Sequence, residues 1–195
     1  MMKLSDVHLL EQIAAGKIVI NPSIPDEHIG SFSIDLRLGK YFRIFKHTKC
    51  PPFIDLGTPS NNIFVMGEQS MEEIKVDEGE AFYLHPGELA LGTTIEHITL
   101  PNDIIGWLDG RSSLARLGLM VHLTAHAIDP GWEGRITLEF ANLGKLPLAL
   151  RPGMRICAVS FEPLSGPTSR PYSKKEGAKY RGQNRPLSSR ISRDR

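Results

Sequence analysis

The feature that most constrains the fold is a series of short strand-like runs, which begins after residue 16 and fills most of the chain. These runs are β-rich or alternate between apolar and polar residues, which is typical of half-buried strands. Pro-Gly dipeptides at 86–87, 130–131 and 152–153 indicate tight turns between runs. The pattern predicts an all-β barrel or sandwich with one leading helix. The candidate strands are residues 17–20, 31–38, 41–45, 81–94, 134–143 and 154–164.

The leading helix is expected in "SDVHLLEQIAAG", residues 5–16. Ser5 can act as its N-cap, and Gly16 can end it. Val7, Leu10 and Ala14 form an apolar stripe that would face the core.

A second helical piece is expected in "GRSSLARLG", residues 110–118, with Ser112 or Ser113 as the N-cap. Arg116 would follow on the same side of the turn. Free backbone N–H groups, hydroxyls and a guanidinium group together bind anions such as phosphate. The alternative is that the serines only cap a helix. "GRSSL" lacks the closing Gly of a GxSxG motif, so the pattern favours capping over a nucleophilic serine.

The charge distribution sets apart a C-terminal arm. Residues 168–195 hold nine Lys and Arg against two acidic residues, a net of +7, so the remainder of this +1 chain carries −6. A basic arm on an acidic body favours an anionic partner, either a phosphorylated small molecule or nucleic acid. The alternative is a solvated extension. We predict a β domain over residues 1–167, with the arm at 168–195 belonging to the same domain.

Several protein classes do not fit the sequence. No apolar run approaches the ~20 residues that span a bilayer, and the N-terminus does not resemble a signal peptide. Cys50 and Cys157 form no CxxC pair, so we expect reduced thiols in a cytoplasmic protein without membrane contact. No P-loop or GxGxxG motif is present. Two thiols cannot build the P-C-x-x-C site of zinc-dependent base deaminases.

The segment "HLTAHAIDPGWEGRITLEF", residues 122–140, concentrates possible catalytic groups. His122 and His126 lie four apart, but Leu123 replaces the Glu of a zinc-protease helix, so one structural and one surface His are favoured. Asp129 would be a turn residue whose side chain bonds nearby backbone. In the following strand, Thr137 and Glu139 would share the more accessible face.

Glu139 is the stronger candidate for chemistry. The opposite face of its strand carries Ile136, Leu138 and Phe140, which would pack into the core. A partly buried carboxyl group has a raised pKa, which suits general acid–base catalysis. The alternative is an exposed strand Glu paired with Arg135 or another base.

The chain resembles bacterial dCTP deaminases. The blocks "GRSSLARLG" and "IDPGW-G-I-LEF" carry the resemblance, which extends through "INPSIPDEHIGSFSIDLRLG", "DEGEAFYLHPGELALGTTIE" and "RPYSKKEGAKYRGQ". The resemblance implies a trimeric dUTPase-like distorted β-barrel or jelly-roll, with active sites between subunits. It also implies hydrolytic deamination of dCTP to dUTP and ammonia without zinc, which supplies dUTP for dUMP and dTTP synthesis.

The resemblance also assigns roles to residues. Glu139 matches the general base that activates water for attack on cytosine C4, and Ser112 matches a hydroxyl that holds this water, aided by the main chain near Ala125. Asp129 matches the deoxyribose contact, and residues 137–139 lie along the base. The expected substrate-binding residues are Arg111, Ser112, Ser113, Leu114, Ala115, Arg116, Ala125, Asp129, Thr137, Leu138, Tyr172, Lys179 and Gln183.

The resemblance implies Mg²⁺ bound through the triphosphate, with no dedicated protein ligands. It implies dTTP feedback inhibition and a homotrimer that binds no nucleic acid. One departure is Ala127, where many bacterial members have Arg in the subunit-contact region of the site.

Two rival functions are compatible with parts of the sequence. The first is a bifunctional enzyme that also hydrolyses dUTP to dUMP, with Asp129 as the candidate water activator. Such relatives tend to show "TAG[WF]ID", whereas this chain has "TAHAID", which favours deamination alone. The second is a nucleotide- or nucleic-acid-binding module that uses the basic arm. Only Tyr172 and Tyr180 interleave with the basic residues, which is poor for stacking on single strands.

Overall fold

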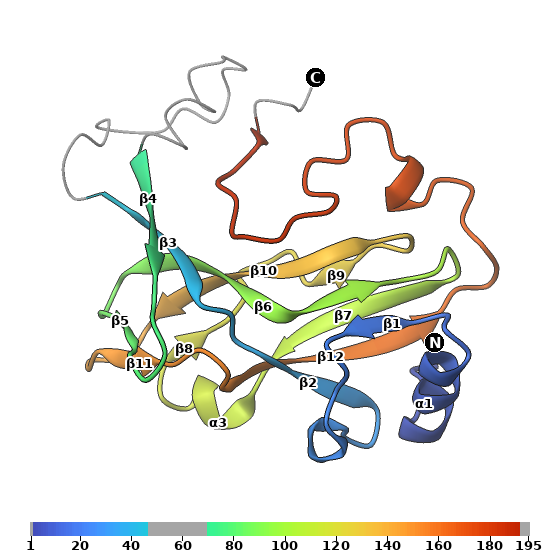
Figure 1. The fold of residues 1–195 in the computed structure, drawn as a ribbon, viewed down its shortest axis with the longest axis horizontal. Helices are drawn as coiled ribbons and strands as arrows, with labels where there is room; N and C mark the ends of the chain where they lie inside the picture. Colours follow the sequence, from blue (N-terminus) through green and yellow to red (C-terminus); the bar gives the residue numbers. More distant parts are fainter. Residues whose placement is uncertain (1, 47–69, 192–195) are drawn as a thin grey trace.

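The strands form three sheets, as the computed structural model of residues 2–46 and 70–191 shows (Figure 1). The largest sheet has the order β4-β3-β6-β10-β8, with β1 paired to β6, and the second has the order β2-β12-β7-β9. The third pairs β11 with β5. The mainly β class is confirmed, although the described strands form three sheets and not one closed barrel.

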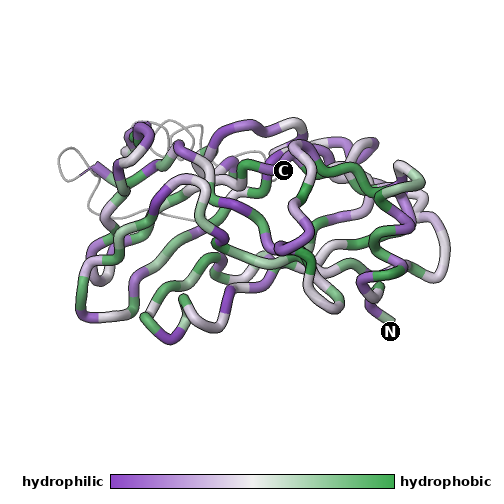
Figure 2. Tube along the Cα trace, turned by 60° about the horizontal axis from the view of Figure 1, so that its bottom comes forward, coloured by the Kyte–Doolittle hydropathy of each residue, from purple (hydrophilic) through white to green (hydrophobic). Residues whose placement is uncertain are grey.

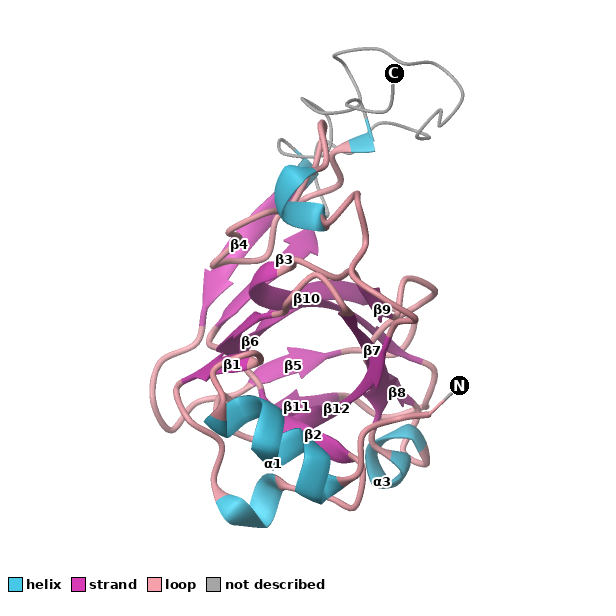
Figure 3. Ribbon diagram, turned by 90° about the vertical axis from the view of Figure 1, so that its right-hand side faces the viewer, coloured by secondary structure: helices cyan, strands magenta, loops and turns pink. Residues whose placement is uncertain are grey.

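The element bounds can be followed in Figures 1 and 3. The strands are β1 (Val19–Asn21), β2 (Ser33–Arg37), β3 (Tyr41–Phe45), β4 (Met71–Lys75), β5 (Phe82–Leu84), β6 (Leu89–Thr99), β7 (Ile104–Gly110), β8 (Leu119–Met120), β9 (Ala127–Ile128), β10 (Glu133–Asn142), β11 (Leu148–Leu150) and β12 (Arg155–Pro163). The helical pieces are α1 (Asp6–Ala14), η1 (Asp26–His28), α3 (Ser112–Ala115) and η2 (Tyr172–Lys174).

Each of the six predicted runs contains a strand, so that part of the prediction is confirmed. The sequence pattern did not predict β4, β7, β8, β9 and β11. Four of these have at most five residues, too few for a clear alternation. β7 was missed because two glycines and an aspartate interrupt its apolar residues.

The predicted alternation along β10 is confirmed. Ile136, Leu138 and Phe140 are buried, whereas Thr137 and Glu139 on the other face are half-buried. The Phe140 ring lies 6.3 Å from the ring of Phe42, and both residues belong to the buried core. Core packing therefore fixes which face of β10 is left for the accessible residues.

Helix α1 lies where it was predicted, and Ser5 is at its N-cap position, but the buried face of the helix was predicted wrongly. Val7, Leu10 and Ala14 are exposed, and the helix packs through Leu9, which is fully buried. The stripe was misassigned because Leu9 and Leu10 are adjacent and the apolar pattern fits either of them. Ser5 occupies the N-cap position, but its Oγ contacts His8 Nδ1 at 2.9 Å and makes no cap bond to the backbone.

Helix α3 also differs from expectation at its start. Arg111 is the N-cap, with an extended backbone, and its carbonyl accepts the N–H groups of Leu114 and Ala115. Ser112 and Ser113 are already helical, so the prediction that one of them caps the helix was wrong. Both serines are exposed.

The three predicted Pro-Gly turns are confirmed. Gly87, Gly131 and Gly153 have φ values of 79°, 78° and 88°, which only glycine adopts readily. At Gly131 an added Cβ would also lie 2.7 Å from Pro171 Cβ, so this glycine lets the C-terminal arm pack closely against the turn.

Hydrophobic and hydrophilic residues alternate along much of the chain, as Figure 2 shows. Among residues 2–46 and 70–191, no helix is long and apolar enough to cross a membrane. Cys157 is a free, buried thiol whose pKa is raised by burial, whereas Cys50 lies outside the described residues.

Candidate active site

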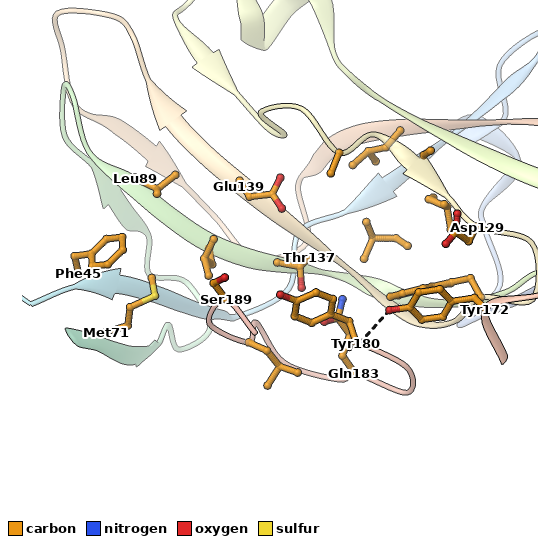
Figure 4. Close-up of a pocket in the computed structure, with 18 residues that line it drawn as sticks. Phe45, Met71, Leu89, Asp129, Thr137, Glu139, Tyr172, Tyr180, Gln183 and Ser189 are labelled. Carbon is orange, nitrogen blue, oxygen red and sulfur yellow. Dashed lines mark hydrogen bonds between the residues drawn. The ribbon is translucent and has the colours of Figure 1, made fainter. Parts of the chain in front are cut away.

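A cavity of about 520 Å³ lies over β6 and β10 and is covered by the C-terminal arm (Figure 4). This volume is typical of small-molecule sites. Most lining side chains are apolar, and a few polar groups project among them. The polar residues at the cavity are Asp129, Thr137, Glu139, Tyr172, Tyr180, Gln183 and Ser189.

Glu139 projects into this cavity from β10, opposite Leu91 of β6. Burial raises the pKa of its carboxyl group, and main-chain hydrogen bonding with Leu123 acts in the opposite direction. Within the part of the chain that the structure describes, Glu139 forms no ion pair with Arg135, so that alternative interpretation was wrong. A carboxyl group that exchanges a proton nearer neutral pH suits general acid–base chemistry.

The side chains of the predicted base-contact residues Thr137 and Leu138 lie on opposite faces of β10. Thr137 lines the cavity, and its buried Oγ1 has no hydrogen-bond partner among the described residues. The Leu138 side chain is fully buried in the core, so this residue offers only its main chain. The side of β10 toward the cavity therefore presents one hydroxyl and one carboxyl group.

Asp129 begins the predicted turn, because its main-chain carbonyl accepts the Trp132 N–H at 3.1 Å. Its carboxylate makes no hydrogen bond to nearby backbone among the described residues, so that part of the prediction was wrong. Its carboxylate lines the cavity. Ala125 and Ala127 also line the cavity.

The arm is attached to β10 beside the cavity. The Gln183 side chain donates from Nε2 to the Arg135 main-chain carbonyl at 3.0 Å, and the Gln183 main-chain carbonyl accepts the Arg135 N–H at 2.9 Å. The Tyr172 hydroxyl accepts the Tyr180 N–H at 3.0 Å, the dashed line in Figure 4. The Tyr172 ring lies 5.2 Å from the Trp132 ring, and burial raises the pKa of its phenol. These contacts hold the arm across the site.

Two of the predicted arm residues, Tyr172 and Gln183, thus line the cavity, whereas Lys179 does not. Tyr180 and Ser189 also line the cavity, and the sequence did not predict either of them as a site residue. The available signal for Tyr180 was an aromatic side chain within the basic arm.

The predicted anion-binding block lies elsewhere in the chain. The cavity includes none of residues 111–116, and Figures 1 and 3 place α3 at the end of the molecule opposite the arm. Arg111 Nη2 pairs with Asp35 Oδ2 at 3.2 Å, whereas Ser112, Ser113 and Arg116 are exposed. A single chain therefore does not bring the block and Glu139 together.

The two histidines of "HLTAH" are near neighbours. The His122 and His126 rings lie 5.9 Å apart, and the His126 ring is 5.2 Å from that of Trp107. Burial lowers the pKa of His122, as does the nearby His126. In residues 2–46 and 70–191, no three His, Cys, Asp or Glu side chains form a group that could hold a metal ion.

Comparison with known proteins gives matches along the chain. A family model described as dCTP deaminase-like matches residues 3–164. The dCTP deaminase of Pectobacterium atrosepticum is 56% identical over 195 residues, covering 99% of this chain and 100% of that protein. The sequence-based resemblance to dCTP deaminases is thus confirmed.

A solved structure supports the fold. The 2′-deoxycytidine 5′-triphosphate deaminase from Agrobacterium tumefaciens aligns with 84% of this chain, with a TM-score of 0.62 and 20% identity. This chain spans about half, 49%, of that protein's length. At this identity the match shows a shared fold.

Proposed function

The chain belongs to the dCTP deaminase-like family, and we propose that it hydrolyses dCTP to dUTP and ammonia, with Glu139 as the general base. The observation that supports Glu139 as the base is its half-buried carboxyl group in a mostly apolar cavity. Family membership supplies the substrate class. The geometry supplies the candidate base.

The chemistry follows from that position. The Glu139 carboxylate takes a proton from water as the water oxygen bonds to C4 of the cytosine ring. The carboxyl group then returns this proton to the exocyclic nitrogen, and the C4–N bond breaks to release ammonia. The second proton of the water, which is left on the oxygen at C4, moves to ring nitrogen N3 and gives the uracil carbonyl group. Because burial raises the pKa of Glu139, the group accepts and returns a proton more readily than a fully solvated carboxyl group would.

Polar groups around the cavity would orient the nucleoside. The free Thr137 hydroxyl can hydrogen-bond the base edge, where dCTP and dUTP differ. Asp129, which lines the cavity, would accept a hydrogen bond from the deoxyribose hydroxyl. The arm, through Tyr172 and Gln183, would close over the nucleotide and exclude water. Leu138 would contribute its main chain only.

The remaining groups would come from a neighbouring subunit. Since the block at residues 111–116 lies outside the cavity of its own chain, we propose a homotrimer in which α3 of one subunit meets the cavity of the next. Ser112 would then hold the attacking water with the main chain near Ala125. Arg116 would bind the triphosphate. The exposure of Ser112, Ser113 and Arg116 agrees with such a role.

Mg²⁺ would be held by the triphosphate oxygens. The described residues include no group of three or more His, Cys, Asp or Glu side chains that could hold the ion by themselves, so the nucleotide and solvent would provide the ligands. Inhibition by dTTP, a cytoplasmic location and an arm that forms one domain with residues 1–167 complete the proposal.

The decisive experiment is to incubate the protein with dCTP and Mg²⁺ and to identify the products. The proposal expects dUTP and ammonia in equal amounts. Appearance of dUMP and pyrophosphate would instead establish the bifunctional alternative. Salt-dependent nucleic-acid binding without nucleotide turnover would support the binding-module alternative and would overturn the proposal.

A further inference from the structure

Strand β6 carries extra residues where it passes the cavity. As far as Arg135, β10 and β6 pair in one register, but from Thr137 onward the register is shifted by two residues. Residues 94–96 of β6 therefore lie opposite Ile136 alone. A bulge of this kind bends the strand and redirects the side chains that follow it.

The Thr94 hydroxyl closes this bulge. It donates to the Glu96 carbonyl at 2.8 Å and accepts the Ile136 N–H at 3.0 Å. Thr94 is fully buried. At the shift in register, the side chain of Thr94 thus satisfies a backbone donor and a backbone acceptor in place of a ladder bond. A buried N–H group without such an acceptor is costly.

The surroundings hold the bulge in place. Arg37 donates to the Glu96 carboxylate from Nε at 2.6 Å and from its backbone N–H at 2.9 Å, and Glu96 is fully buried. The Gly39 N–H donates to the Thr93 carbonyl at 2.7 Å, and a Cβ on Gly39 would lie only 2.9 Å from that oxygen. Both contacts tie the bulge to the end of β2.

We propose that Thr94 is a positioning residue: its hydroxyl holds β10 in the register that points Thr137 and Glu139 into the cavity. Glu139 follows Ile136 by three residues on the same strand, so a movement of the Ile136 peptide is transmitted to the carboxyl group. This inference deepens the proposed function, because it takes Glu139 as the base. The register itself does not depend on any activity.

The kinetic test compares Thr94→Val, which removes the hydroxyl at nearly constant volume, with Thr94→Ser, which keeps it. The Val variant should lose kcat on the order of 10²-fold, the effect of a misplacement of about 1 Å, with KM for dCTP little changed. Its acid limb of kcat against pH should move toward lower pH, because a displaced Glu139 is less buried. Thr94→Ser should restore both the rate and the profile. A merely structural role would lower thermal stability and leave both unchanged.

A second measurement does not use activity. We expect the Glu139 carboxyl pKa, followed by carbon-13 NMR and assigned with Glu139→Gln, to fall toward its ordinary value in Thr94→Val and to stay raised in Thr94→Ser. In the unaltered protein the Ile136 amide should be strongly protected from hydrogen exchange. If Thr94→Val does not fold, a comparison of Thr94→Ala with Thr94→Ser tests the effect of the hydroxyl in a pair of smaller side chains.

The outcomes separate the two proposals. An unprotected Ile136 amide, or a Glu139 pKa unchanged between folded variants with and without the hydroxyl, overturns the positioning role. If the unaltered protein releases no ammonia from dCTP while the amide and pKa results hold, the proposed function fails and the positioning role stands.

Discussion

Replacement of Glu139 by Gln removes the proposed base at almost constant volume. Its carboxyl group is half-buried, and no ion pair with Arg135 is lost, so the cavity should keep its shape. A general base contributes about 10²–10⁴-fold to a rate. At 1.36 kcal/mol for each tenfold, the expected rise in the barrier is about 3–5 kcal/mol.

The assay measures ammonia release from saturating dCTP, together with dCTP binding by calorimetry. Turnover should fall by that factor, and Kd for dCTP should change little. Glu133→Gln is the matched control, because Glu133 lies on the same strand but is exposed. A Glu139→Gln enzyme that stays within about tenfold of the unaltered rate would remove Glu139 from the role of base.

Thermal unfolding against pH separates lost chemistry from lost structure. Because burial raises the folded-state pKa of Glu139 above its ordinary value of 4.5, its protonated form favours the fold. The resulting stability is fully present below that ordinary value, and it is lost as pH rises through the raised folded-state pKa. The Gln variant lacks this dependence, so it should melt at or above the Tm of the unaltered protein at neutral pH. A lower Tm would attribute the lost activity to misfolding.

Two further outcomes are expected. Arg116→Ala should raise KM for dCTP about tenfold or more, because it removes a charge-assisted phosphate contact. The control Lys17→Ala, at an exposed residue, should leave KM unchanged. Equal KM values for the two variants would show that residues 111–116 do not bind phosphate. Deletion from Thr168 onward should reduce turnover strongly but leave cooperative unfolding in place, because the buried hydrophobic core lies in residues 9–161. Full activity of the truncated chain would mean that the arm is only a solvated extension.

The sequence predicted the position of Glu139 because strand alternation is a local property. Ile136, Leu138 and Phe140 must face the core, and this alone turns Glu139 toward the accessible side. The Pro-Gly turns, such as the one at Gly131, were predicted for the same reason, because a turn depends on residues adjacent in the sequence. Where two readings of one local pattern were possible, as for the buried face of α1, the choice depended on tertiary packing and was missed.

The rest of the site depends on long-range pairing. The contact of Gln183 with Arg135 and the bulge closed by Thr94 join residues 48 and 42 positions apart, and no local pattern encodes such pairs. The separation of α3 from the cavity is likewise a property of the whole fold. The resemblance placed Ser112 and Glu139 in one site, and the structure shows that they do not meet within one chain.

That separation has a genetic consequence. If each site takes Glu139 from one copy and Arg116 from another, then two alleles, each inactive alone, can complement one another when expressed together. A mixed assembly contains some sites in which both contributing copies retain the required residue. In such an assembly, each copy that carries one of these variants would disable one site, its own when Glu139 is replaced and a neighbour's when Arg116 is replaced.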